Sequence, residues 1–87
     1  MNEQDVEKKL VALVAEILPP DPQRGPLGRS TKLLQDPGID SLTMASLGFA
    51  VSGAFGIGTE ELVVMLPNFG TLGEAATLIH AELQKAG

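Results

Sequence analysis

The chain has 87 residues, 44% of them hydrophobic, and a net charge of −5 at pH 7. This length allows one domain with one core, predicted over residues 1–87, and disfavours an elaborate catalytic site. The six basic residues are scattered, which disfavours nucleic acid as a partner, and the absence of cysteine excludes disulfides, thiolate metal sites and a thiol nucleophile.

The apolar residues are mainly Leu, Ala and Val, with three Phe and no Trp or Tyr, which favours packed helices over sheets. The N-terminus, Met1–Asp5, is acidic and polar, unlike a signal peptide, so we expect a cytoplasmic protein. The uncharged run from Ser41 to Thr59 approaches the length of a membrane span. Its four glycines and several hydroxyl side chains argue against that reading, and no membrane association is expected.

The first predicted helix runs from Glu3 to Leu18. Its apolar residues recur at spacings of four, three and four, which is the stripe of an amphipathic helix: Val6, Leu10, Leu13 and Ile17. Pro19 and Pro20 end this helix, because proline lacks the amide donor and restricts the residue before it.

A long irregular connection is predicted from Pro19 to Asp40, which holds five of the six prolines. Its apolar residues are expected to anchor it to the core, and one short helical turn is expected after Ser30 or Thr31. The anchors are Leu27, Leu33 and Leu34.

The second helix is predicted from Ser41 to Phe55. Asp40 is the expected N-cap, which leaves Ser41 at the first helical position near solvent, and Gly56 is the expected left-handed C-terminus. The core stripe is expected to consist of Met44, Leu47, Val51 and Phe55. A second apolar line, pointing around another side, consists of Leu42, Ala45 and Phe49.

A short third helix is predicted to begin with Thr59 as its cap and to end at Pro67, with Leu62 and Val63 among the core residues. Thr71 and Glu74 fit a capping box that opens the last helix. The buried face of that helix is expected to consist of Leu72, Ala76, Ile79 and Leu83.

Known catalytic and metal motifs do not fit the region of Ser41. A hydrolase nucleophile would require glycines two residues before and after the serine, and the lone His80 is expected to be a solvated helix residue. Asp36 and Asp40 lack the spacing of a calcium loop, and no phosphate-binding loop is present, so no catalytic or metal-binding residue is predicted. From spacing alone, Ser41 is a plain helix-start residue.

The stretch Gly38-Ile39-Asp40-Ser41-Leu42, followed by Phe55-Gly56-Ile57, resembles the phosphopantetheine attachment region of acyl and peptidyl carrier proteins. The likeness covers most of the chain, with an amphipathic first helix, a long loop, a helix opened by Asp-Ser-Leu, a short third helix and a last helix opened by Thr71-Leu72. It implies an all-α four-helix bundle of the acyl-carrier type.

The resemblance implies that Ser41 receives a 4′-phosphopantetheine group from coenzyme A through a phosphopantetheinyl transferase, and that Asp40 supports the attachment. Acyl or aminoacyl cargo is then held as a thioester. The implied partners are that transferase, a loading enzyme (an adenylating ligase or an acyltransferase) and downstream synthase enzymes. The chain itself is expected to be a monomer and not an enzyme, because the prosthetic group supplies the thiol and the partners supply catalysis.

One departure from the family concerns charge. Fatty-acid carriers usually place acids along the second helix, whereas the aligned positions here are Ser46, Ser52 and Gly53. Electrostatic steering from this helix should therefore be weak. The expected partner-binding residues are Leu42, Ala45, Ser46, Phe49, Glu60 and Glu61, with Asp36 and Asp40 as further acids around the apolar patch. The alternative for Phe49 is that it packs under the long loop.

These features favour a discrete carrier of polyketide or nonribosomal-peptide biosynthesis. Besides the uncharged second helix, the stretch from Leu66 to Leu72 looks more like carriers of modular assembly lines. Two alternatives stay open: a carrier of fatty-acid synthesis, and a helical interaction module that carries no prosthetic group.

Overall fold

The computed structural model describes residues 2–18, 26–34 and 40–86. Four α-helices lie in these ranges, α1 (Glu3–Ile17), α2 (Ser41–Phe55), α3 (Thr59–Met65) and α4 (Leu72–Ala86), with a short 3-10 helix, η1 (Leu66–Asn68), between the last two. The described ranges contain no strand, and their extended segments pair only in an isolated antiparallel bridge between Lys32 and Thr71. The predicted all-helical class with four α-helices is therefore confirmed.

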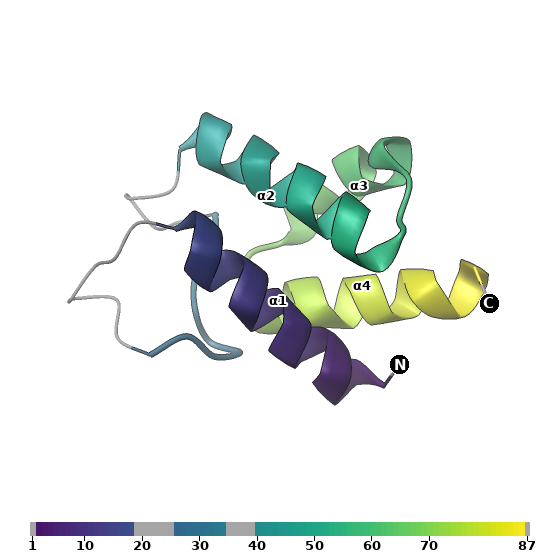
Figure 1. Cartoon of the computed structure of the whole chain (residues 1–87), viewed down its shortest axis with the longest axis horizontal. Helices are drawn as coiled ribbons and strands as arrows, with labels where there is room; N and C mark the ends of the chain where they lie inside the picture. Colours follow the sequence, from purple (N-terminus) through teal and green to yellow (C-terminus); the bar gives the residue numbers. More distant parts are fainter. Residues whose placement is uncertain (1, 19–25, 35–39, 87) are drawn as a thin grey trace.

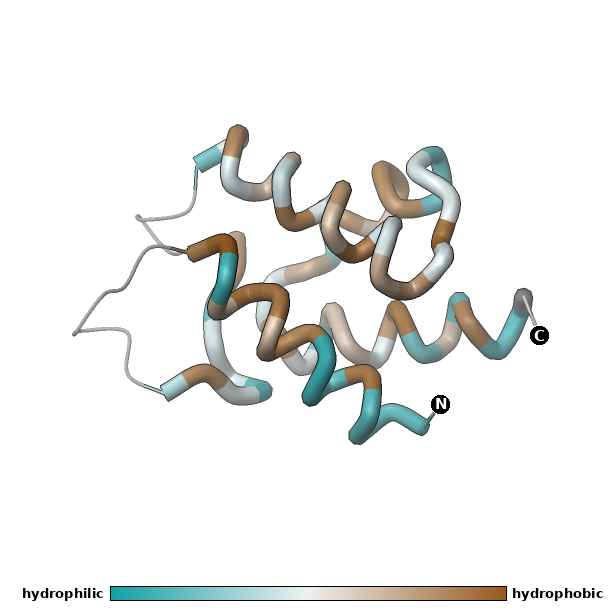
Figure 2. The backbone as a smooth tube through the Cα atoms, in the orientation of Figure 1, coloured by the Kyte–Doolittle hydropathy of each residue, from teal (hydrophilic) through white to brown (hydrophobic). Residues whose placement is uncertain are grey.

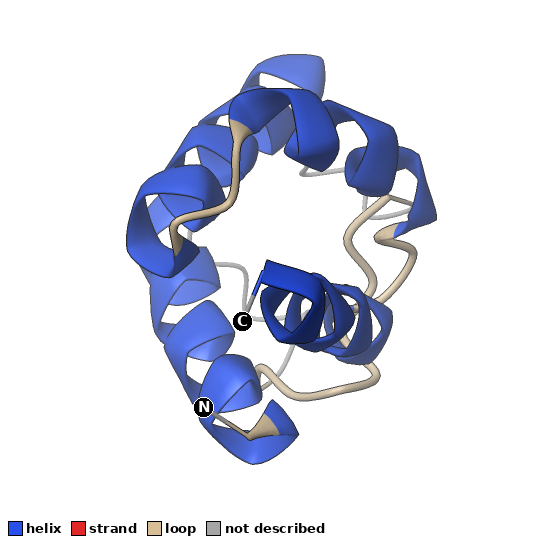
Figure 3. Ribbon diagram, turned by 90° about the vertical axis from the view of Figure 1, so that its right-hand side faces the viewer, coloured by secondary structure: helices blue, strands red, loops and turns tan. Residues whose placement is uncertain are grey.

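The helices surround one core (Figure 1). Helix α1 packs against both α4 and α2, and α3 packs against α2. Along the long axis of the molecule α1 runs in the opposite direction to α2 and α4, so the start of α1 and the end of α4 lie at the same end. In the view along α4 the other helices form an arc beside and above it (Figure 3). Helix α2 thus has one face on the core and another on the outside.

The core takes one stripe from each helix, together with anchors from the connections. The stripe predicted for the first helix is confirmed in part, because Val6 and Leu10 are fully buried while Leu13 and Ile17 pack at the edge. The buried apolar residues are Val6, Leu10, Val14, Leu18, Leu33, Leu47, Val51, Phe55, Ile57, Leu62, Phe69, Leu72, Ala75, Ala76 and Ile79. The core is therefore mainly aliphatic, with Phe55 and Phe69 as its two aromatic residues.

Several predicted helix ends are confirmed. Gly56 ends α2 in the left-handed conformation (φ 70°), and its N–H donates to the carbonyl of Ser52 at 3.0 Å. Thr71 opens α4, since its Oγ1 accepts a hydrogen bond from the N–H of Glu74 at 3.1 Å. Leu18 is extended directly before Pro19, as expected for a residue that precedes proline.

The predicted limits of the third helix are wrong by a residue or two. Its N-cap is Gly58, whose carbonyl accepts from the N–H of Leu62 at 3.1 Å, so Thr59 is the first helical residue and not the cap. Pro67 does not terminate α3 directly: α3 ends at Met65, and Pro67 lies in the first turn of η1, where its missing N–H leaves no bond unmade.

Two of the predicted core contacts are also wrong. Val63 is 66% exposed, because the core side of this seven-residue helix is occupied by Leu62. Leu33 anchors the long connection as predicted and Leu27 packs at the edge of the core, but Leu34 is exposed. The expected helical turn after Ser30 is absent from residues 26–34, where Thr31 instead closes a turn with Gly28, its N–H donating to the Gly28 carbonyl at 3.1 Å.

Backbone hydrogen bonds fasten the segment 28–34 to the start of α4. The N–H of Leu72 donates to the carbonyl of Thr31 at 2.8 Å, and the N–H of Leu33 donates to the carbonyl of Gly70 at 2.9 Å. The N–H of Gly73 donates to the carbonyl of Arg29 at 2.9 Å. The bonds from Leu72 and Gly73 satisfy amides at the start of α4 that have no partner within the helix.

The Arg29 side chain extends this connection to α1. Its Nη1 lies 3.3 Å from Glu3 Oε2 and 3.7 Å from Glu7 Oε1, while its Nη2 donates to Thr77 Oγ1 at 3.2 Å. A Cβ at Gly73 would lie 3.0 Å from the Arg29 carbonyl oxygen, so glycine there favours the close approach of the two segments. No local pattern in the sequence indicates this contact.

Candidate functional site

Asp40 and Ser41 form the N-terminal end of α2 as the sequence predicts. Asp40 has an extended backbone (φ −95°, ψ −178°), and its Oδ1 accepts a hydrogen bond from the N–H of Thr43 at 2.8 Å. Its carbonyl accepts the N–H of Met44 at 3.0 Å, which starts the helical pattern. Ser41 is therefore the first residue of α2, and both Asp40 and Ser41 are exposed.

The cap also sets the charge of Asp40. The hydrogen bond from the backbone N–H of Thr43, followed by a smaller one from the Thr43 side chain, lowers the pKa of Asp40 below its ordinary value of 3.8. The carboxylate is therefore ionised at neutral pH. The capping bond and the charge together hold the first turn of α2, and with it the position of Ser41.

The second apolar line of α2 is on the outside of the molecule. Leu42 is 75% exposed, Phe49 is 71% exposed, and Ala45 and Ser46 are exposed between them. The alternative that Phe49 packs under the long connection is therefore wrong. The tube coloured by hydropathy shows α2 in brown and pale shades along its length, whereas the first turns of α1 are hydrophilic (Figure 2).

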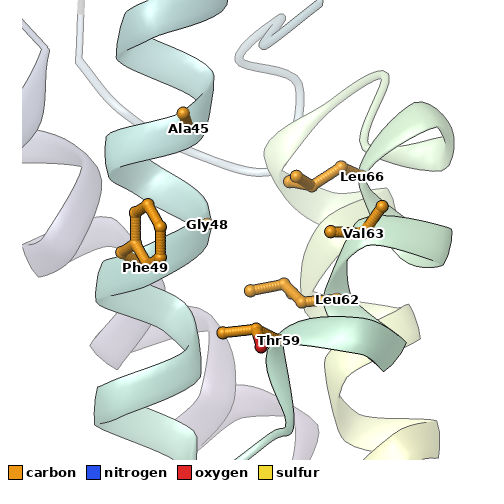
Figure 4. A pocket seen from close by; sticks show the side chains of 7 residues that line it. All are labelled: Ala45, Gly48, Phe49, Thr59, Leu62, Val63 and Leu66. Carbon is orange, nitrogen blue, oxygen red and sulfur yellow. The ribbon is translucent and has the colours of Figure 1, made fainter.

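A groove runs between the outer side of α2 and α3 (Figure 4). Its volume is about 150 Å³, and every lining residue except Thr59 is apolar. Leu62 and Leu66 point from the α3 side towards α2, and Phe49 stands at the opposite edge. We call this the α2–α3 groove, and its lining consists of Ala45, Gly48, Phe49, Thr59, Leu62, Val63 and Leu66.

Gly48 forms the floor of the α2–α3 groove, a role that the sequence analysis missed. A Cβ at this position would lie 3.3 Å from Leu66 Cδ1 and 3.7 Å from Leu62 Cδ2. Gly53, one and a half turns further along α2, has open space at the same point. A glycine between Leu47, which is buried, and Phe49, which is exposed, could have indicated a close contact between helices. The side chains that it approaches are distant in the sequence, so they could not be identified.

The two predicted acidic partner residues lie differently. Glu60 and Glu61 are both exposed in the first turn of α3. Glu60 precedes Val63 and Val64 by three and four residues and so shares their side of the helix. Glu61 instead lines a separate hollow with Glu82 and Leu83 of α4. Asp36 lies outside the described residues.

No basic residue occurs between Lys32 and His80 in the sequence, so α2 is uncharged and α3 carries only acidic charge. His80 lies on α4, where its Nε2 is 3.3 Å from Gln84 Nε2. Among the described residues, no three histidine, aspartate or glutamate side chains gather as metal ligands would. None of the helices in the described ranges is long and apolar enough to cross a membrane.

Comparisons of the chain with protein-family models, with curated proteins and with solved structures found no match.

Proposed function

We propose that this chain is a carrier protein of the acyl or peptidyl carrier type and that Ser41 bears its 4′-phosphopantetheine group. The observation that carries the proposal is the motif Gly38–Leu42, which coincides with an exposed serine at the first position of α2 behind a capping aspartate. The three long helices α1, α2 and α4, together with the short helix α3, support a bundle of the acyl-carrier type.

The residues present fit a covalently attached arm. A transferase would join Ser41 Oγ to the phosphate of the phosphopantetheine half of coenzyme A, with loss of the serine proton and release of adenosine bisphosphate. When bound, the group supplies the thiol that holds acyl or aminoacyl cargo as a thioester, which suits a chain without cysteine. Asp40 holds the first turn of α2 and thereby fixes where the Ser41 hydroxyl is presented.

The outer side of α2 is the proposed surface for the transferase, the loading enzyme and the downstream synthase enzymes. Leu42, Ala45, Ser46 and Phe49 are exposed beside Ser41, and Glu60 adds negative charge at the far end. Because α2 itself is uncharged, shape and apolar contact would determine recognition more than long-range steering. This favours a discrete carrier in polyketide or nonribosomal-peptide biosynthesis over one in fatty-acid synthesis.

The test is to incubate the purified chain with coenzyme A and a broad-specificity phosphopantetheinyl transferase, and to measure its intact mass. We expect an increase by one phosphopantetheinyl group in the wild type and none in Ser41→Ala. Ser30→Ala is the control, since it removes an exposed hydroxyl outside the proposed partner surface and should still be loaded.

An unchanged wild-type mass would contradict the carrier proposal and would favour a helical interaction module without a prosthetic group. Loading that persists in Ser41→Ala would contradict the assignment of the residue. Circular dichroism of the three proteins checks that each is folded, and little change is expected because both serines are exposed.

A further inference from the structure

The exposed apolar surface around the α2–α3 groove is larger than the groove itself. Beyond Phe49 and Val63 at its edges, Leu42 lies towards the start of α2, and Val64, 73% exposed, lies on the outer side of α3. We call these four residues the apolar rim. Phe49 and Val63 border the same groove, and contiguous exposed apolar surface marks interaction sites in soluble proteins.

The groove has the dimensions of one large side chain. An apolar cavity of about 150 Å³ accepts a molecule the size of benzene, and the α2–α3 groove has about this volume. Gly48 lines the groove on the α2 side, and a Cβ there would lie 3.3 Å from Leu66 Cδ1 and so narrow the space between the helices. A single aromatic or leucine side chain would therefore fit between Gly48, Leu62 and Phe49.

The charges around the groove indicate which residues of a partner would flank the inserted side chain. Asp40 precedes the apolar rim on α2, and Glu60 lies one turn before Val63 and Val64 on α3. No basic residue lies between residues 33 and 79. A partner with lysine or arginine beside its apolar anchor would complement this pattern, whereas a second copy of the same acidic face would be repelled.

We propose that the α2–α3 groove is the anchor site of a protein partner, which inserts one aromatic or leucine side chain over Gly48 and places basic residues beside Glu60. The partner covers the apolar rim, which a small acyl group in the groove would leave exposed to water. The biological setting rests on the proposed carrier function, but the binding is a property of the unmodified chain and can be measured without loading.

The probe is a capped helical peptide that presents one phenylalanine flanked by two lysines, titrated into the ¹⁵N-labelled full chain. We expect amide shifts at Ala45, Gly48, Thr59 and Val63. Replacing the phenylalanine of the probe by alanine should weaken binding about tenfold, as for a buried anchor residue. Replacing its lysines by glutamates should weaken binding at low salt and less at high salt.

Matched variants of the chain locate the anchor. Gly48→Ala should weaken binding about tenfold because it fills the groove, whereas Gly53→Ala, on the same helix with open space, should change it less than about twofold. Glu60→Gln should weaken binding about threefold and Glu61→Gln, which faces the Glu82 hollow, should not. If Gly48→Ala alters the packing of α3, Phe49→Ala is a second groove variant, because the Phe49 side chain is exposed.

Equal affinity for the phenylalanine and alanine probes, or shifts centred on Glu61 and Glu82, would overturn the inference. Groove shifts with hexanol but not with the peptide would do the same, and would assign the groove to small apolar cargo instead. If the peptide binds but no transferase loads the chain, the anchor site is supported and the carrier proposal is contradicted. A failure of the anchor site can therefore be distinguished from a failure of the carrier proposal.

Discussion

Polar contacts between distant segments hold the α1–α4 side of the molecule together, whereas the α2–α3 side is apolar both in its contacts and on its surface. Arg29 joins the long connection to α1 and α4 through its backbone carbonyl and its guanidinium. Phe49 and Val63, on the other side, are exposed next to a groove without basic residues. The difference separates a side that is fastened by hydrogen bonds and ion pairs from a side that exposes apolar side chains to solvent.

The largest difference in stability is expected between substitutions of two phenylalanines, one on each of these two sides. Phe69 is fully buried, whereas Phe49 is mostly exposed. Phe69→Ala should lower the free energy of unfolding by about 3–5 kcal/mol because it leaves a cavity in the core. Phe49→Ala should change it by no more than about 0.5 kcal/mol. Urea unfolding followed by circular dichroism measures both, and equal losses would contradict the placement of Phe49 on the exposed surface of α2.

A smaller effect is expected where the connection meets α4. Gly73→Ala places a Cβ 3.0 Å from the carbonyl oxygen of Arg29, which is backbone and cannot easily move. We expect a loss of about 1–3 kcal/mol in the free energy of unfolding. Gly53→Ala, with open space around it, should instead stabilise α2 by about 0.5–1 kcal/mol. If Gly73→Ala is as stable as the wild type, the contact with Arg29 does not constrain the fold.

Local sequence chemistry was sufficient to predict the ends of α2. Asp40 and Gly56 act through bonds to residues three or four positions away, and both were assigned correctly. The third helix was harder, because seven residues give too few turns for the apolar spacing to show that Leu62 is buried and Val63 exposed. Gly58 and Thr59 are also both acceptable caps by residue type.

Contacts between segments far apart in the chain were not predictable in this way. The Arg29 contacts reach residues more than forty positions away along the chain, at Gly73 and Thr77. Gly48 acquires its role only when α3 packs beside it. Since periodicity and capping report on neighbours along the chain, neither signal indicated these sites. The position of Ser41, exposed at the start of α2, was predictable from local capping chemistry and is confirmed, whereas its role as attachment residue stays a prediction.

The smallest effect on stability is expected from the charge of Asp40. Its pKa is lower in the folded chain than in the unfolded one, because the N–H of Thr43 donates to the carboxylate. The charged cap therefore stabilises the fold above the ordinary pKa of 3.8, and this contribution is lost as the pH falls through the lowered value. Asp40→Asn keeps an acceptor oxygen but cannot titrate. The wild type should have a higher Tm than Asp40→Asn at neutral pH, and this difference should shrink in acid. A difference that does not change with pH would show that protonation of this carboxylate is not linked to folding.

Tandem mass spectrometry of the loaded wild-type chain would show directly whether Ser41 carries the arm. We expect the peptide that contains Ser41 to carry the phosphopantetheinyl mass, and fragmentation to assign the mass to this residue. An unloaded chain, or the mass on Ser46, Ser52 or another hydroxyl, would contradict this expectation.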